Sequence, residues 1–169
     1  MSRRLHLLHA LDAHRAALTA RLDALPEAVV HAAPAPGAWS LAQLAEHLVL
    51  IDGGLRFDGA PAAAPARLTS RLRSTGIQTI LALPLRIEGP PSAQYVMPSV
   101  APHWPDVRAR WATLRAGWVR GHAAADARAV AFLHPIAGPF LIDDALAFLL
   151  AHHRHHDAQV RRTLAALGR

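Results

Sequence analysis

The sequence contains no cysteine, and this absence narrows the chemistry that the chain can perform. Neither a disulfide framework nor a thiolate site can form, so a metal ion would have to be bound by histidine and carboxylate side chains. Lysine is absent too, because all 18 residues of the Lys+Arg count are arginines. The arginines are scattered and no basic run is interleaved with aromatic residues, so the formal charge of +6 does not indicate nucleic-acid binding.

Long hydrophobic runs are missing as well. Apolar residues form short periodic stretches and never reach the ~18 unbroken positions that a membrane helix needs. The N-terminal stretch lacks the apolar centre of a signal peptide, because His6, His9 and His14 interrupt it. We therefore expect a cytoplasmic protein without a membrane partner. A length of 169 residues suits a single domain over residues 1–169.

Helical periodicity dominates the first third of the sequence. Leucines at helical spacing predict a first helix from Ser2, its N-cap, to Leu25. Ser40 and Gln43 have the spacing of a capping box and predict the start of a second helix. His47 lies at the edge of the apolar face of this helix, and Glu46 points to the opposite side.

The middle of the sequence breaks the pattern. Prolines interrupt the stretch from Gly59 to Pro102, within which 79–87 fits either a strand or a helical turn, so we expect a long irregular crossover. A third helix is predicted from Trp104, with Trp111 and Trp118 as ordinary core residues, ending before Asp126. Acidic residues favour the start of a fourth helix near 143, which continues to 167.

Five histidines in this last helix and the second are the most informative residues. His152 and His156 share one face across a single helical turn, and His47 can complete a three-imidazole metal site from a second helix. Spacing alone does not separate His152 from His153, because partners at i+4 and at i+3 both fit one metal ion. The alternative for His153 and His155 is a solvated or rim position.

Three sequence blocks resemble a known family. They are residues 36–48 (PGAWSLAQLAEHL), residues 134–140 (HPIAGPF) and the pattern His152-x-x-x-His156-x-x-Gln159. In order and spacing they are similar to the DinB/YfiT-like superfamily of metalloenzymes. The resemblance implies an all-α fold, a four-helix bundle in up-down-down-up order with a long crossover between the second and third helices.

Carried over residue by residue, the resemblance implies a metal triad of His47, His152 and His156 and so favours His152 over His153. Three neutral imidazoles suit a divalent zinc, nickel or iron ion alike. We also expect a homodimer, because bundles of this size often pair through helix faces and members of the family do so. The family often has a threonine cap before the last helix, where this chain has Leu141. His134 is interpreted as an element that fixes its loop.

Two functions are compatible with the triad. The resemblance implies a metal-dependent transferase that uses a low-molecular-weight thiol as nucleophile on a small-molecule substrate, with the triad acting only as ligands. The alternative is a non-enzymatic metal-binding or stress-associated bundle, in which the ion braces the second and fourth helices. The sequence names no general base for either.

Overall fold

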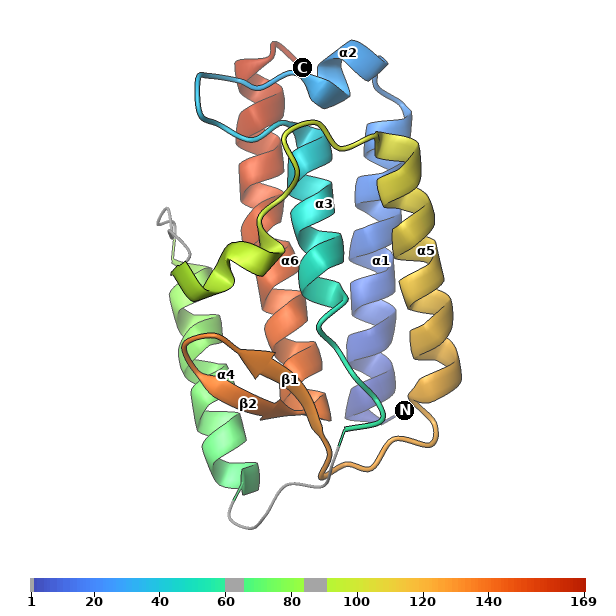
Figure 1. Ribbon diagram of the computed structural model, residues 1–169, viewed down its shortest axis with the longest axis vertical. Helices are drawn as coiled ribbons and strands as arrows, with labels where there is room; N and C mark the ends of the chain where they lie inside the picture. Colours follow the sequence, from blue (N-terminus) through green and yellow to red (C-terminus); the bar gives the residue numbers. More distant parts are fainter. Residues whose placement is uncertain (1, 60–65, 84–90) are drawn as a thin grey trace.

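Four upright helices form a bundle in the computed structural model, which describes residues 2–59, 66–83 and 91–169 (Figure 1). These helices are α1 (Arg3–Asp23), α3 (Leu41–Asp52), α5 (Trp104–Gly121) and α6 (Ile142–Ala166). α1 and α6 rise while α3 and α5 descend (Figure 1), so the expected up-down-down-up bundle is confirmed. In the described residues, no helix combines the length and the apolar character needed to span a membrane.

Two of the predicted helix starts rest on side-chain caps. The Ser2 hydroxyl accepts a hydrogen bond from the backbone N–H of Leu5 at 3.3 Å. Ser40 and Gln43 form a complete capping box, in which each side chain bonds the other's backbone N–H. α6 starts after Leu141 without a side-chain cap, and acidic residues in its first turn favour the helix N-terminus instead.

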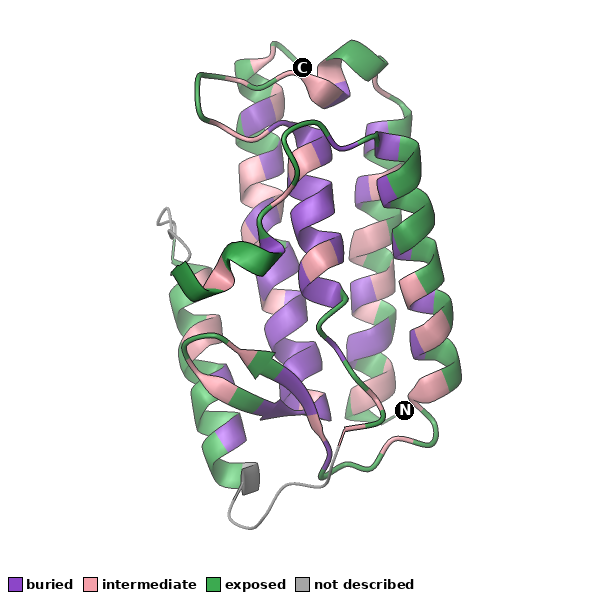
Figure 2. Ribbon diagram, in the orientation of Figure 1, coloured by how far each residue is buried: buried purple, intermediate pink, exposed green. Residues whose placement is uncertain are grey.

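Buried residues are concentrated on α3 and α6, whereas α1 and α5 carry more exposed positions (Figure 2). α6 is buried along most of its length, since it packs against α1, α3 and α4. The predicted core tryptophans Trp104, Trp111 and Trp118 are all buried. Burial of such large rings supplies much of the hydrophobic stabilisation of a domain this size.

The crossover between α3 and α5 differs from the irregular segment that the sequence suggests. It contains α4 (Ala66–Ala82), which packs against α6, and a short 3₁₀ helix, η1 (Pro91–Val96). The run between Pro65 and Pro84 is free of proline and long enough for a helix. Its pattern misleads because the first half of the inner side carries the buried serines Ser70 and Ser74, and only Ile77 and Leu81 in the second half pack on the core. The second part of the 79–87 segment lies outside the described residues.

Two smaller elements were not predicted. α2 (Glu27–His31) is a single turn and a half after α1, too short for periodicity to reveal. β1 (Val130–His134) and β2 (Gly138–Leu141) form an antiparallel hairpin beside α4 and α6. Gly138 has a φ of +76°, which glycine adopts without strain. The His134 ring accepts hydrogen bonds from two backbone N–H groups of the turn, as expected of a loop-fixing residue.

Candidate metal centre

Three histidines from two helices meet in the interior of the bundle. His47 comes from α3, and His152 and His156 lie one turn apart on α6, which packs against α3. One ring nitrogen of each histidine lies within 4.8 Å of the others, and all three residues are buried. No other group of histidine, cysteine or acidic residues in the described ranges comes together in this way. The residues that the sequence nominates are therefore brought to one point.

Hydrogen bonds orient two of the three rings. The Nδ1 of His47 lies 2.7 Å from the carbonyl oxygen of Val96 in η1, and the Nδ1 of His156 lies 2.9 Å from the Oε1 of Gln159. An oxygen of this kind only accepts, so in each ring Nδ1 carries the proton and Nε2 keeps its lone pair. Partners of this sort hold the tautomer that a metal ligand needs.

The spacing of the ring nitrogens fits a shared ion. The Nε2 atoms of His152 and His156 lie 3.3 Å apart. Two nitrogens bound ~2.0–2.1 Å from one tetrahedral zinc ion would be separated by about 3.3 Å. In the described part of the chain the buried Nδ1 of His152 has no hydrogen-bond partner, so Nε2 is the nitrogen of this ring that the site engages. An imidazole donor set suits zinc, nickel and iron alike.

Burial keeps the triad neutral. Loss of solvent around the ring, assisted by the nearby imidazoles, lowers the pKa of His156 to about 3. Burial also lowers the pKa of His152 well below its usual value, and the other histidines act in the same direction. For His47 burial outweighs the hydrogen bond to Val96, and the pKa is again lowered. At neutral pH all three rings are therefore neutral, and each keeps one nitrogen lone pair for a metal ion.

Aromatic rings border the triad on two sides. The Trp39 ring lies 5.0 Å from the His47 ring, between centroids, and the Phe148 ring lies 5.7 Å from that of His152. Both neighbours are large and apolar, and they limit the positions that the imidazoles can adopt. Such packing pre-organises ligand residues before an ion arrives.

His153 is a buried structural residue, and its expected rim position is wrong. Its Nε2 lies 3.0 Å from the Oδ1 of Asp52 on α3, and both side chains are at most 3% exposed. The other carboxylate oxygen, Oδ2, accepts a hydrogen bond from the Trp111 indole at 2.7 Å. His153 thus joins α6 to α3 and α5. The signal for it was Asp52, an acid on the apolar face of its helix.

Glu46 was expected on the side of its helix opposite the apolar face. It does point away from the triad, but the segment after η1 covers it, so it is buried. Burial alone would raise the pKa of this carboxyl, but hydrogen bonds from Ser99 and an ion pair with Arg110 outweigh it and the pKa is lowered. Glu46 therefore anchors the chain that carries Val96, the partner of His47.

The remaining histidines lie outside the triad. His155 is half-buried and its Nδ1 lies 2.9 Å from the carbonyl oxygen of Leu81 at the end of α4. His14 on α1 contacts Asp157 on α6, at 3.0 Å. Both tie helices together at the surface of the bundle rather than joining the metal centre.

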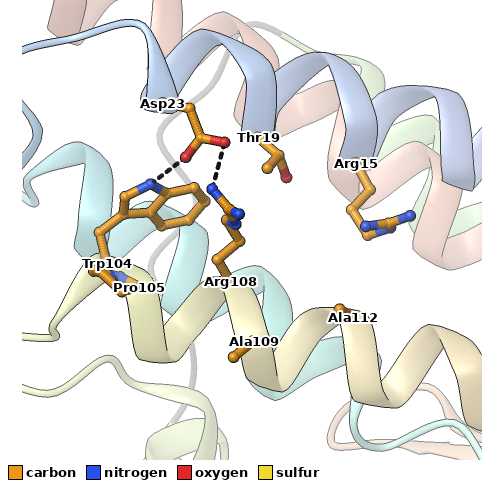
Figure 3. Close-up of a pocket in the computed structure, with 8 residues that line it drawn as sticks. All are labelled: Arg15, Thr19, Asp23, Trp104, Pro105, Arg108, Ala109 and Ala112. Atoms are coloured by element: carbon orange, nitrogen blue, oxygen red, sulfur yellow. Dashed lines mark hydrogen bonds and ion pairs between the residues drawn. The ribbon is translucent and has the colours of Figure 1, made fainter.

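A pocket of about 500 Å³ lies between α1 and α5 (Figure 3). Within it Asp23 accepts hydrogen bonds from Trp104 and Arg108, and these bonds, that of Trp104 foremost, lower the pKa of the carboxyl. No residue of the triad lines this pocket. It is therefore separate from the candidate metal centre.

Sequence reasoning did not identify the partners of the triad. Gln159 stood in the quoted motif without a role, and the Val96 carbonyl is a backbone group that no side-chain pattern can reveal.

Comparison with known proteins identifies the family but no individual relative. No curated protein and no solved structure matches the chain. The sequence profile of the DinB superfamily, however, matches residues 10–160, a span that includes the whole triad. On this match over most of its length, the chain belongs to the DinB superfamily.

Proposed function

We propose that this protein is a metal-dependent transferase in which His47, His152 and His156 hold one divalent ion. The proposal rests on a single observation, the convergence of three buried, neutral imidazoles from two helices. Three protein ligands with a further position left open are typical of catalytic rather than structural zinc sites. When bound, such an ion lowers the pKa of a thiol or water in its open position.

The chain itself provides ligands and walls but no sulfur nucleophile. Because it contains no cysteine, a thiol used in the reaction must come from a low-molecular-weight cofactor. Hydrogen bonds of His47 to the Val96 carbonyl and of His156 to Gln159 orient the rings that would hold the ion. The half-buried Trp39 and the buried Phe148 pack against the rings of His47 and His152 and reduce their contact with water.

Titration of small thiols into the cobalt-substituted protein tests this function. We expect a change in the visible absorption spectrum that saturates with thiol, because the sulfur enters the coordination sphere. Absence of any change at saturating thiol counts against a thiol transferase. The untagged His155→Ala variant is the matched control, since His155 lies beside the triad on the same helix but bonds Leu81 instead.

A second candidate function is a metal-braced bundle without catalytic activity. It is supported by the depth of the triad, whose residues are at most 9% exposed, and by its position across α3 and α6. A brace predicts closed coordination, no response of the cobalt spectrum to thiol, and a large rise of the melting temperature on metal binding.

Both functions require the ion at the triad. Elemental analysis of untagged His47→Ala and His152→Ala proteins tests this shared premise. We expect both variants to lose the metal. Metal content that survives both substitutions would place the ion elsewhere in the chain.

A further inference from the structure

Two polar contacts join α1 to α5, and the pocket of Figure 3 extends from one of them toward the other. At the first contact Asp12 pairs with Arg115, and at the second Asp23 accepts hydrogen bonds from Trp104 and Arg108. The pocket has a volume of about 500 Å³, and we name it the α1–α5 pocket. A space of this size accommodates a small organic molecule.

Arg15 lines this pocket and has no carboxylate of its own. Its neighbour is Asp12, but both oxygens of that carboxylate accept hydrogen bonds from Arg115. The Nη2 of Arg15 stays 3.6 Å from the nearer oxygen, which is too far for a hydrogen bond. Arg115 is fixed further by Trp118, whose ring centroid lies 4.4 Å from the guanidinium carbon. The charge of Asp12 is therefore matched by Arg115, and the charge of Arg15 is left over.

Unused hydrogen-bond donors gather at the same interface. In the part of the chain that the structure describes, four buried side-chain polar atoms have no partner, and three of them belong to Arg15, Thr19 and Arg115. The two arginine nitrogens only donate, and the hydroxyl of Thr19 can donate as well. A buried donor without an acceptor costs free energy. The interface between α1 and α5 therefore lacks an acceptor that carries a negative charge.

Arg15 and Thr19 are placed to share one ligand group. They lie one turn apart on the side of α1 that faces α5 (Figure 3). The Arg15 side chain is 25% exposed and only weakly held by Asp12, so its guanidinium can turn toward a ligand. We propose that the α1–α5 pocket binds a small organic carboxylate, whose two oxygens accept hydrogen bonds from Arg15 and Thr19.

The rest of the lining determines the class of ligand. Trp104, Pro105, Ala109 and Ala112 present apolar surface from α5, and the alanines are small enough to leave room beside it. An inorganic anion would leave this surface in contact with water. A carboxylate that carries an aromatic or hydrocarbon group covers it and gains the free energy of apolar burial.

Asp23 determines which way round the ligand lies. It follows Arg15 by eight residues on α1, which is ~12 Å along the helix axis. The hydrogen bond from Trp104, followed by the contacts of Arg108, lowers the pKa of the Asp23 carboxyl, so this end of the pocket already holds an anion. Because two anions repel, the carboxylate of the ligand lies at the Arg15 end and its apolar group at the Trp104 end.

Isothermal titration of benzoate into the full chain tests the site. Benzoate has one carboxylate and an aromatic ring, and benzamide has nearly the same shape without the charge. We expect saturable binding of benzoate and at least ~10-fold weaker binding of benzamide, because hydrogen bonds to a charged group are the stronger ones. Absence of saturable binding up to ~10 mM benzoate overturns the proposal, as does equal affinity for benzamide. Inorganic phosphate that binds as tightly as benzoate would contradict the apolar part of the site.

Two substitutions test the residues that hold the carboxylate. Arg15→Gln removes the charge and should weaken benzoate binding by ~10-fold or more, and Thr19→Val removes the hydroxyl and should weaken it less. Arg21→Gln is the matched control, since Arg21 is exposed on the same helix and does not line the pocket. Circular dichroism checks that each variant is folded. Affinity that stays the same in both Arg15→Gln and Thr19→Val overturns the site.

His152→Ala separates this site from the candidate metal centre. Carboxylates also bind metal ions, so benzoate has a second possible target at the triad. No triad residue lines the α1–α5 pocket, and we therefore expect His152→Ala to bind benzoate as tightly as the unmodified protein does. Loss of benzoate binding in His152→Ala would assign the ligand to the metal centre and overturn the proposal.

Discussion

Two histidine clusters lie side by side between α3 and α6, and they differ in the groups that their ring nitrogens face. In the first, His47, His152 and His156 direct ring nitrogens toward one another and no carboxylate is among them. In the second, His153 bonds Asp52, which also bonds Trp111. Both clusters are buried, and His152 and His153 are neighbours in the chain. Burial of a histidine therefore does not distinguish a metal ligand from a core residue.

The difference lies in the partner of the second ring nitrogen. Each oxygen of the Asp52 carboxylate accepts a hydrogen bond from one buried donor, so the polar groups of the second cluster satisfy one another without any ligand. In the triad, oxygen acceptors take the Nδ1 protons of His47 and His156, so Nε2 is the nitrogen of each ring that can bind a cation, and the Nε2 of His156 lies 3.3 Å from that of His152. Ring nitrogens whose lone pairs point at one another repel unless a cation or a proton lies between them. A metal ion bound at the triad would provide that cation.

The largest expected effect on metal binding comes from replacing one of the two neighbouring histidines, His152 or His153, by alanine. His152→Ala removes a ligand and should abolish metal binding. The loss of metal affinity should exceed the ~10–100-fold that removal of an outer hydrogen-bond partner costs. His153→Ala should retain the metal and lose stability instead. Competition with a chelator and thermal unfolding of both untagged proteins measure the two quantities. Equal loss of metal in both variants would erase the distinction between the clusters.

Acid should destabilise the metal-free protein through the triad. The pKa of His156 is about 3 in the folded chain, against an ordinary value of 6.5, and burial lowers those of His47 and His152 too. Below pH ~6.5 the unfolded chain binds protons that the folded chain refuses, so the free energy of unfolding falls by up to ~1.4 kcal/mol per pH unit for each histidine. The loss continues as the pH drops toward 3 and is absent above 6.5.

Urea unfolding at a series of pH values measures this dependence. Replacing His156 by glutamine should reduce the slope between pH 6 and 4, because one group that takes up a proton on unfolding is removed. A slope that is the same in both proteins would show that His156 does not contribute.

Loss of Asp52 should lower the free energy of unfolding without removing a nitrogen from the triad. Asp52→Ala leaves the ring of His153 and the indole of Trp111 buried without their acceptor, at a cost of about 3 kcal/mol. Chemical denaturation measures the change in the free energy of unfolding. Asp58→Ala is the control, since Asp58 is exposed and pairs with the exposed Arg56, and should change little. A small effect at both positions would contradict the role of Asp52.

The smallest expected effect concerns the outer partner of His156. Gln159→Ala removes the acceptor for the Nδ1 proton and should weaken metal binding ~10–100-fold with little change in stability. Gln159→Glu keeps an acceptor oxygen and should preserve affinity. Isothermal titration of zinc into the metal-free proteins measures both. Equal affinity in the alanine and glutamate variants would show that this hydrogen bond does not orient the ring.

The sequence pattern predicted correctly those features that depend on residues close together in the chain. Leucine periodicity and the caps at Ser2 and Ser40 predicted the bundle helices, because helix formation is local. Periodicity failed for α4, since serines replace apolar residues on the first half of its inner face. It also misjudged His153, which pairs with the buried Asp52 of α3 and does not lie at the rim.

By itself, the sequence determined that four helices form and that histidines at 47, 152 and 156 lie on or near their inner faces. Helical spacing left His152 and His153 equivalent. The family resemblance favoured His152, but only the tertiary structure shows the physical difference, by placing a carboxylate opposite the ring of His153 and two imidazoles opposite that of His152. The Val96 carbonyl that orients His47 was likewise beyond any pattern. The physical reason is that hydrogen-bond partners 49 to 101 residues away are selected by packing, not by neighbours in the chain.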